Sequence, residues 1–502
     1  MRQRLLSLLS IALLAGACAG SASTTGPNFG GGQPPQHHDP TPPPAYEPGP
    51  TRDPGVPVNP ETDPDQDEVS TFGLDVDTAS YTMARQAVES GIWPDPSTVR
   101  VEEWVNAFDQ GYERPTDGTF AIAVDGGPTP FLAEDEILLR IGIAARDVRD
   151  RARDDAALTF VIDTSGSMER QGRLELVKDA LRVLVRELGD EDTVAIVTFG
   201  DDARIVLHPT SAAEADAILY VIDRLRPGGS TNLEAGLRLG YELARETLTE
   251  NGIDRVILAS DGVANVGLTD GDSILASIRK DAAAGIELIS IGVGMGDYND
   301  ALLEQLANEG DGFYAYVNDL AEAERLFTDD LTGSLQAIAL DARAQVEFDS
   351  DAVATYRLLG YENRAIDDDD FTDDTVDAGA IGAGHQVTAL FALRLREDIA
   401  RDERLAVVRL RWTEPEQGRP AEIATPVRLR ELSGSFRQTS SHLQLDALVA
   451  ATAEALRGSS GAPRMSVGEL ADLASELGED LPQTDQVHEF LTLLDTLASM
   501  EE

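Results

Sequence analysis

The chain has 502 residues, of which 40 are Lys or Arg and 90 are Asp or Glu, so its formal net charge is −50 at pH 7. This length corresponds to about two to four domains, and a hydrophobic fraction of 42% is enough to build their cores. The negative charge argues against nucleic-acid binding, because phosphate would be repelled and no basic patch compensates. A single Cys excludes both a disulfide framework and a Cys-ligated zinc or iron–sulfur site.

Residues 1–18 have the layout of a secretory signal peptide. Arg2 and Arg4 precede an apolar run from Leu5 to Ala17, which ends in small residues. The run is shorter than the roughly 20 apolar residues that a membrane-spanning helix needs. The pattern therefore predicts export.

The only cysteine, Cys18, stands at the expected cleavage point. The segment resembles a bacterial lipoprotein signal, which implies that Cys18 becomes the lipidated N-terminus and anchors the protein to the membrane. Ala19 after it resembles the signal for sorting to the outer membrane. The alternative is a plain signal peptide that happens to contain a cysteine.

Residues 19–70 are predicted to be a disordered tether. Of the 25 prolines in the chain, 13 fall between Pro27 and Pro64, among Gly, Ser, Thr and Asp residues. Such a composition cannot bury enough apolar surface to offset the entropy of ordering, and proline favours an extended spacer.

Residues 71–150 are predicted to form an N-terminal helical segment followed by β-strands. Apolar spacing indicates short helices over 77–89 and 100–110, separated by a Trp-Pro-Asp-Pro sequence that must break a helix. Two strands are expected at 120–124 and 136–143.

Residues 155–333 alternate between apolar runs of strand length and segments with helical periodicity. The expected strands are 158–162, 194–199, 205–208, 255–259, 287–293 and 312–317. Continuous Val, Ile and Leu strands separated by helices are typical of a parallel sheet covered on both faces. The sequence therefore predicts an α/β class domain with a doubly wound parallel sheet.

Residues 335–432 are predicted to be a β-rich domain, and residues 437–502 a C-terminal helical region. We expect the strands at 119–144 to pair with strands of 335–432, so that the α/β domain is inserted in, or flanked by, the β-rich domain. An acidic loop at 367–374 is interpreted as a solvated turn, with a Ca²⁺ site as a minor alternative.

Oxygen-bearing side chains gather in three predicted loops, two of which directly follow a predicted strand. Asp163-Thr164-Ser165-Gly166-Ser167 follows the strand 158–162, while 228–232 (Gly-Gly-Ser-Thr-Asn) and 260–262 (Ser-Asp-Gly) are further loops. The sites of such sheets lie at the carboxyl ends of the strands. Carboxylates and hydroxyls are hard oxygen donors of the kind that Mg²⁺ prefers. The alternative is ordinary turn chemistry without a metal.

The ordered set resembles the metal-ion-dependent adhesion site (MIDAS) of von Willebrand factor type A domains. The pattern of that family is matched by Asp163, Ser165, Ser167, Thr231 and Asp261. The resemblance implies a Rossmann-like fold and a bound Mg²⁺, or Mn²⁺ or Ca²⁺. It also implies that the three hydroxyls bind the metal directly and the two Asp largely through water. An open position would accept an Asp or Glu of a partner protein.

The resemblance extends past this domain, because four further motifs resemble bacterial YfbK-like lipoproteins, which contain a type A domain. They are Phe72–Tyr81, Arg100–Glu103, Gly292–Asp300 and Gly360–Arg364. The resemblance covers essentially residues 70–500, and because that family has no assigned reaction it implies the fold more than the function.

These observations lead to one principal hypothesis and two others. The first is a lipid-anchored envelope protein, exported to the outer membrane, that binds an envelope or extracellular protein through its metal site. The second is a structural or regulatory protein whose own acid, for instance from 367–374, fills the open metal position. An enzyme is not expected, since phosphate-loop and nucleophile-elbow motifs are missing and His208, His385 and His442 stand alone in the sequence.

Overall fold

The computed structural model describes most of the chain from residue 58 onwards. The described ranges are 58–74, 77–148, 154–248, 252–261, 271–294, 300–324, 326, 337–374, 376, 378–415, 417–458 and 465–501. The predicted signal peptide with Cys18 and most of the predicted tether lie outside these ranges. Within the ranges, no helix is long and apolar enough to cross a membrane.

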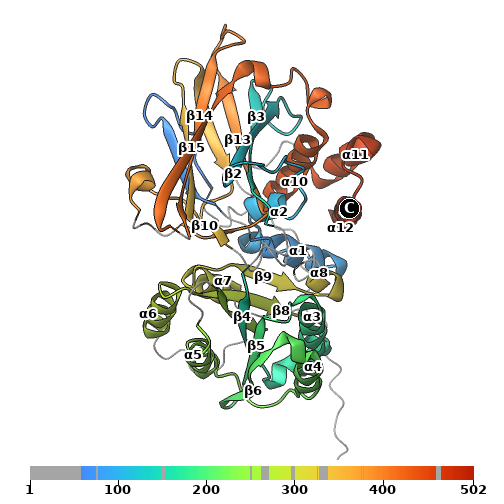
Figure 1. Cartoon of the computed structure of the whole chain (residues 1–502). Helices are drawn as coiled ribbons and strands as arrows, with labels where there is room; N and C mark the ends of the chain where they lie inside the picture. Colours follow the sequence, from blue (N-terminus) through green and yellow to red (C-terminus); the bar gives the residue numbers. More distant parts are fainter. Residues whose placement is uncertain are drawn as a thin grey trace, which may run out of the picture. The chain divides into compact units, whose positions relative to one another are not determined.

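The central α/β domain is built on a six-stranded sheet of order β6-β5-β4-β7-β8-β9 (Figure 1). The strands are β4 (Ala156–Asp163), β5 (Thr193–Phe199), β6 (Ala203–Ser211), β7 (Ile253–Ser260), β8 (Ile286–Val293) and β9 (Tyr314–Val317). All residues of β4 and β7 are buried, as expected for central strands covered on both faces. The predicted doubly wound sheet is confirmed.

Helices cover both faces of this sheet (Figure 1). One apolar cluster includes α3 (Arg173–Glu187), α4 (Ala215–Asp223) and α8 (Leu320–Glu324). The other includes α5 (Leu233–Ala244), α6 (Gly271–Ala282) and α7 (Asp300–Asn308). Successive residues of β4 contribute to opposite clusters, Phe160 to the first and Val161 to the second, because side chains alternate along a strand.

The sheet differs from the prediction at one edge. β6 was expected within a parallel series, but it is antiparallel to β5. Only residues 200–202 separate the two strands. A parallel connection needs a crossover of about a dozen residues, so this short link allows only a hairpin.

Two antiparallel sheets form the β-rich domain, one of order β1-β10-β14-β15 with β12 paired to β10, the other of order β11-β13-β3-β2. The strands are β1 (Val69–Gly73), β2 (Phe120–Gly127), β3 (Glu136–Ala145), β10 (Ala337–Phe348), β11 (Val353–Leu359), β12 (Ile381–Gly382), β13 (Gln386–Leu395), β14 (Arg404–Glu414) and β15 (Arg419–Arg428). Both sheets contribute to one apolar core, for example through Val346 and Phe391. β3 precedes the α/β domain and β13 follows it, yet the two strands pair. The predicted insertion is therefore confirmed.

The folded part begins earlier than the predicted end of the tether at residue 70. Asn59 donates its side-chain amide to the carbonyls of Leu358 (3.2 Å) and Gly360 (2.7 Å), and Thr62 pairs with Tyr356. β1 pairs along β10. These contacts are made mainly by backbone and polar groups, so the apolar pattern of the sequence does not reveal them.

The helix predicted over 100–110 is also shorter in the structure, where α2 comprises Val101–Asn106. Gln110 turns back and donates its side-chain amide to the carbonyls of Val105 (2.6 Å) and Phe108 (3.1 Å). Gly111 follows with a positive φ of 65°. A side chain thus satisfies carbonyls at the end of the helix that further helical turns would otherwise bond.

Five helices share a further core. They are α1 (Ala79–Glu89), α2, α10 (Ser441–Arg457), α11 (Val467–Leu477) and α12 (Asp485–Glu501). Trp104, Leu448 and Phe490 lie in this core, which also contacts Leu138 of β3. The predicted C-terminal helical region therefore packs on the second sheet.

The 3-10 turns are Pro96–Thr98, Gly166–Gly172, Ala212–Glu214, Asp368–Thr372, Leu429–Glu431, Phe436–Gln438 and Gly478–Asp480.

His385 lies where the β-rich domain meets the α/β domain. It lines a small gap together with Arg255, Glu287 and Asp311. Its Nδ1 is buried and has no hydrogen-bond partner in the described part of the chain. Burial, together with the charge of Arg114, lowers the pKa of His385 to about 4. The imidazole is therefore neutral in the folded protein at neutral pH.

We expect His385 to make the protein less stable as the pH falls. The pKa of His385 is lower in the folded than in the unfolded state. The contribution of the neutral imidazole to the free energy of unfolding is therefore complete above about pH 6.5 and decreases towards pH 4. Near pH 5 the loss should be about 2 kcal/mol in the free energy of unfolding, measured with urea. His385→Gln should flatten this dependence, whereas replacing the exposed His208 by Gln should not. Equal slopes in all three proteins would contradict the expectation.

Candidate metal centre

The predicted metal-binding residues lie at one edge of the six-stranded sheet. β4 ends at Asp163, and its neighbour β7 ends at Ser260, directly before Asp261. Because neighbouring parallel strands end at the same edge, the two carboxylates are brought into electrostatic contact. The sequence order alone, with Asp163 and Asp261 on distant loops, could not fix this adjacency.

Asp163 is fully buried, with 0% of its surface exposed. Its Oδ1 accepts a hydrogen bond from the Ser165 backbone N–H (2.7 Å), and its Oδ2 accepts one from the Ser260 hydroxyl (2.9 Å). The Ser165 and Ser167 hydroxyls lie 2.9 Å apart. Three of the five predicted residues are thus gathered on one turn.

The segment that carries Thr231 is bound directly to this turn. Gly228 N–H donates to the Thr164 carbonyl (2.6 Å), and Gly166 N–H donates to the Gly229 carbonyl (3.0 Å). Asp201 holds the same segment by accepting from the Ser230 N–H and hydroxyl, both at 2.8 Å. Thr231 itself is buried.

Gly229 allows this close approach. Its φ is +93°, and a Cβ placed on it would lie 3.0 Å from the Asp201 Oδ2. Gly166, Gly228 and Gly229 are exposed, whereas Asp163, Ser165 and Thr231 beneath them are buried. The oxygen donors therefore lie just below a glycine-lined surface that faces solvent.

Asp261 is also buried, and its Oδ2 accepts from the Arg173 guanidinium at 2.6 Å. Arg173 is the first residue of α3. A Cβ on Gly294, at the end of β8, would lie 2.2 Å from the Arg173 Nε, so the guanidinium fits only because that residue is glycine. Arg173 was not among the predicted site residues, and no local spacing could have linked it to Asp261.

The electrostatics of the two carboxylates differ. Burial, and to a smaller extent the charge of Asp261, raises the pKa of the Asp163 carboxyl to about 6. Within the described ranges, no basic side chain forms an ion pair with Asp163, whereas Asp261 has Arg173. A buried carboxylate without a counter-ion is costly. A divalent cation would supply the missing positive charge, and the surrounding hydroxyl oxygens suit Mg²⁺.

The acidic loop at 367–374 is bound to the β-rich domain. Thr71 donates to Asp368 (2.6 Å), Arg343 donates to the carbonyls of Phe371 (2.8 Å) and Asp373 (2.7 Å), and Arg411 pairs with Asp374 (2.8 Å). Among the residues that the structure describes, no group of three or more His, Cys, Asp or Glu could hold a metal ion, and this includes the whole loop. The alternative of a Ca²⁺ site there gains no support.

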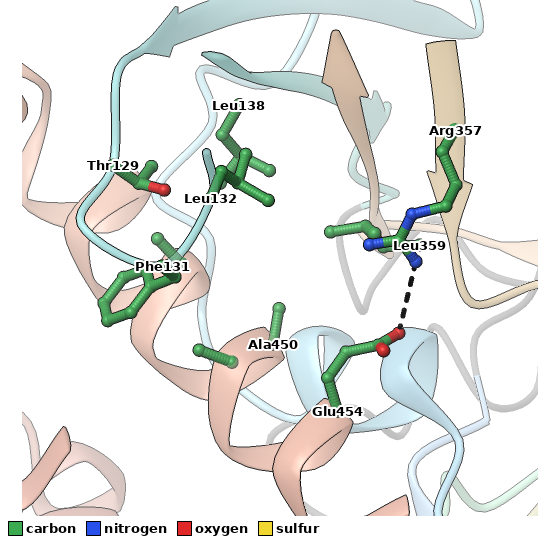
Figure 2. Close-up of a pocket in the computed structure, with 10 residues that line it drawn as sticks. Thr129, Phe131, Leu132, Leu138, Arg357, Leu359, Ala450 and Glu454 are labelled. Atoms are coloured by element: carbon green, nitrogen blue, oxygen red, sulfur yellow. Dashed lines mark ion pairs between the residues drawn. The ribbon is translucent and has the colours of Figure 1, made fainter. Parts of the chain in front are cut away.

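A separate small hollow, with a cavity volume of about 30 Å³, lies between helix α10 and the second sheet (Figure 2). Apolar side chains such as Phe131, Leu138 and Leu359 form most of its wall. Arg357 and Glu454 face each other across it, at 3.8 Å. The hollow thus has an apolar lining closed by an ion pair, and it is distinct from the sheet edge that carries Asp163.

Family models match three parts of the chain. Residues 157–329 match the von Willebrand factor type A domain, and residues 333–500 match the C-terminal part of the uncharacterized protein YfbK. Residues 55–139 match a model described as von Willebrand factor.

Comparison with whole proteins agrees. The chain is 34% identical over 462 residues to the uncharacterized protein YfbK of Escherichia coli, covering 87% of this chain and 79% of that protein. It is 32% identical over 191 residues to the uncharacterized protein sll0103 of Synechocystis, covering 38% and 44% of the two chains. A von Willebrand factor type A structure from Catenulispora acidiphila aligns over 74% of this chain and 89% of its own, with 16% identity and a TM-score of 0.45. The 34% identity to the Escherichia coli protein over 87% of the chain shows that the chain belongs to the YfbK family, and the match of residues 157–329 shows that its central α/β domain is a von Willebrand factor type A domain.

Proposed function

We propose that the type A domain binds a divalent cation, Mg²⁺ or alternatively Mn²⁺ or Ca²⁺, and uses it to bind a partner protein. The ligands would be Asp163, Ser165, Ser167, Thr231 and Asp261. The observation that carries the proposal is the fully buried Asp163 carboxylate, which lies among hydroxyls and has no basic partner within the described ranges.

The partner would supply an Asp or Glu side chain. Neutral hydroxyls donate little charge to a cation, so a cation held mainly by them keeps a strong attraction for a further carboxylate. Mg²⁺ takes about six oxygens and usually keeps some waters, one of which the carboxylate would replace. The exposed glycines above the site, Gly166, Gly228 and Gly229, would leave room for this approach.

The strongly negative chain does not prevent such binding. Repulsion between the −50 net charge and an acidic partner acts at long range. Physiological salt screens it beyond about 8 Å, whereas a metal–carboxylate bond forms at contact. The local charge of the site therefore decides whether the carboxylate binds.

The place of action would be the cell envelope. We propose that Cys18 is lipidated after export and that the Pro-rich segment holds the folded part away from the outer membrane. The partner would then be another envelope or extracellular protein. Replacing Cys18 with Ser should release the protein from the membrane fraction without changing Mg²⁺ binding.

We expect no catalysis at this site. Among the described residues, the Ser165 hydroxyl lies 2.9 Å from the Ser167 hydroxyl, and no His, Lys or Arg side chain bonds either of them. The Asp163 carboxylate beside Ser165 is itself a proposed ligand, so we propose that both hydroxyls bind the metal.

The alternative function is a clamp in which an acid of the same chain occupies the open metal position. The acidic loop was the predicted source, but it is bound by Thr71, Arg343 and Arg411, which lie on the first sheet of the β-rich domain. These contacts favour an external carboxylate.

A pull-down from envelope extracts tests the proposal. Full-length protein should capture partners in Mg²⁺ and release them in EDTA, and Asp163→Ala should capture none of these partners in either condition. Asp202→Ala is the matched control, because Asp202 is an exposed carboxylate on the neighbouring turn after β5. Capture of the same proteins by Asp163→Ala, or in EDTA, would refute the proposal.

A further inference from the structure

The Arg173–Asp261 ion pair adds a positive charge to the metal centre. The Arg173 guanidinium is 6% exposed and Asp261 is 1% exposed, and the two groups are 2.6 Å apart. Such a pair is far more shielded from solvent than a surface ion pair, so water screens its charge only weakly. The charge of Arg173 therefore acts on any ion bound between Asp163 and Asp261.

The surroundings fix the guanidinium in this place. Gly172, with a φ of +73°, precedes Arg173 and allows the chain to enter α3 there. Gly294 leaves the space that the guanidinium occupies. The Tyr316 hydroxyl lies within hydrogen-bond distance of both the Gly294 carbonyl and the side-chain oxygen of Gln86 of α1, the latter at 2.7 Å. Groups from α1, β9 and the end of β8 thus support the position of Arg173.

We propose that Arg173 sets the charge of the metal site so that the occupied site attracts a carboxylate. A divalent cation with the two carboxylates of Asp163 and Asp261 is neutral overall, and Arg173 makes the assembly positive by one charge. This inference rests on the proposed function, because it concerns the same site. It assigns to Arg173 the role of a specificity-determining residue that favours an anionic partner at some cost in metal affinity.

Metal titration of three variants tests this role. Arg173→Gln removes the charge, Arg173→Lys keeps it, and Arg170→Gln removes an exposed charge from the same loop. By calorimetry, Arg173→Gln should bind Mg²⁺ at least about ten-fold more tightly than the wild type, because the substitution removes the repulsion between the buried guanidinium and the cation. The other two variants should stay within about three-fold of the wild type.

A second measurement tests the attraction of the anion directly. Acetate serves as the probe carboxylate, with chloride at equal ionic strength and free Mg²⁺ determined by an indicator dye. Because coupling between two ligands is reciprocal, acetate should raise the Mg²⁺ affinity of the wild type by at least about two-fold. The increase should be lost in Arg173→Gln and kept in Arg173→Lys.

The outcomes separate the two proposals. A wild type that binds no Mg²⁺ refutes the proposed function. A wild type that binds Mg²⁺ while Arg173→Gln binds it equally or more weakly refutes the role of Arg173 alone. The absence of an acetate effect in the wild type also refutes that role, and this measurement does not depend on whether Arg173→Gln folds.

Discussion

Replacing Asp163 with Asn is expected to make the metal-free protein more stable while abolishing its response to Mg²⁺. The Asp163 carboxylate is buried without a cation, and burial raises its pKa to about 6. Because the folded pKa lies above the unfolded one, ionisation of Asp163 costs folding free energy at neutral pH, and this cost vanishes below the unfolded value. Near pH 7 the cost is about 2–3 kcal/mol, which Asn would remove.

Urea unfolding with EDTA and with saturating Mg²⁺ measures both effects. The wild type should gain stability when Mg²⁺ is added. Asp163→Asn should have a higher free energy of unfolding than the wild type in EDTA, and Mg²⁺ should not increase it further. Asn keeps the size of the side chain, and its amide oxygen can still accept from the Ser165 N–H. Asp202→Asn is the control, because this carboxylate is exposed and its loss should change neither value by more than about 0.5 kcal/mol. An Asp163→Asn protein that is less stable in EDTA, or still stabilised by Mg²⁺, would contradict the expectation.

The core of the type A domain could be predicted because its signal is local. β4 and β7 are buried along their whole length, so they appear in the sequence as short apolar runs. The proposed metal-binding motif extends from the end of one such run, and the residues of one turn, Asp163 to Ser167, stay together whatever the order of the strands. The strand order itself, with β4 next to β7, comes only from the three-dimensional packing.

Other features could not be predicted because their causes lie far apart in the chain. Asn59 is fixed by the carbonyls of Leu358 and Gly360, about three hundred residues away. Arg173, at the start of α3, pairs with Asp261, which follows β7 and is 88 residues away in the chain. For Asn59 and Arg173 the sequence shows only a polar residue, and its partner gives it a role. The antiparallel direction of β6 is a different case, because its cause is local: it depends on the short link of residues 200–202 rather than on an apolar pattern.

A buried ion pair joins the C-terminal helices to the second sheet. Arg140 of β3 donates from Nε to the Asp446 Oδ2 of α10 at 2.5 Å, and both side chains are buried. Arg140 also donates to the Gln110 carbonyl (3.0 Å) and side-chain oxygen (2.8 Å), and it stacks 4.3 Å from the centre of the Tyr112 ring. One arginine thus connects β3, α10 and the segment after α2.

Removing Arg140 alone should be severely destabilising. Arg140→Leu leaves the Asp446 carboxylate buried and uncompensated, which costs about 3–5 kcal/mol in the free energy of unfolding. The double variant Arg140→Leu with Asp446→Leu should be more stable than Arg140→Leu, because it leaves no buried charge. Urea unfolding near pH 7 measures all three proteins.

Two observations would distinguish this ion pair from a surface pair. Arg182 pairs with Asp223 near the surface of α3, so Arg182→Leu should cost no more than about 1 kcal/mol. Burial raises the pKa of Asp446, and without Arg140 this carboxyl should take up a proton as the pH falls. Arg140→Leu should therefore lose less stability, relative to the wild type, near pH 5 than near pH 7.

If the double variant is no more stable than Arg140→Leu, the charge of Asp446 is not the cause of the lost stability. The hydrogen bonds from Arg140 to Gln110, which join β3 to the segment after α2, would then account for the loss of stability.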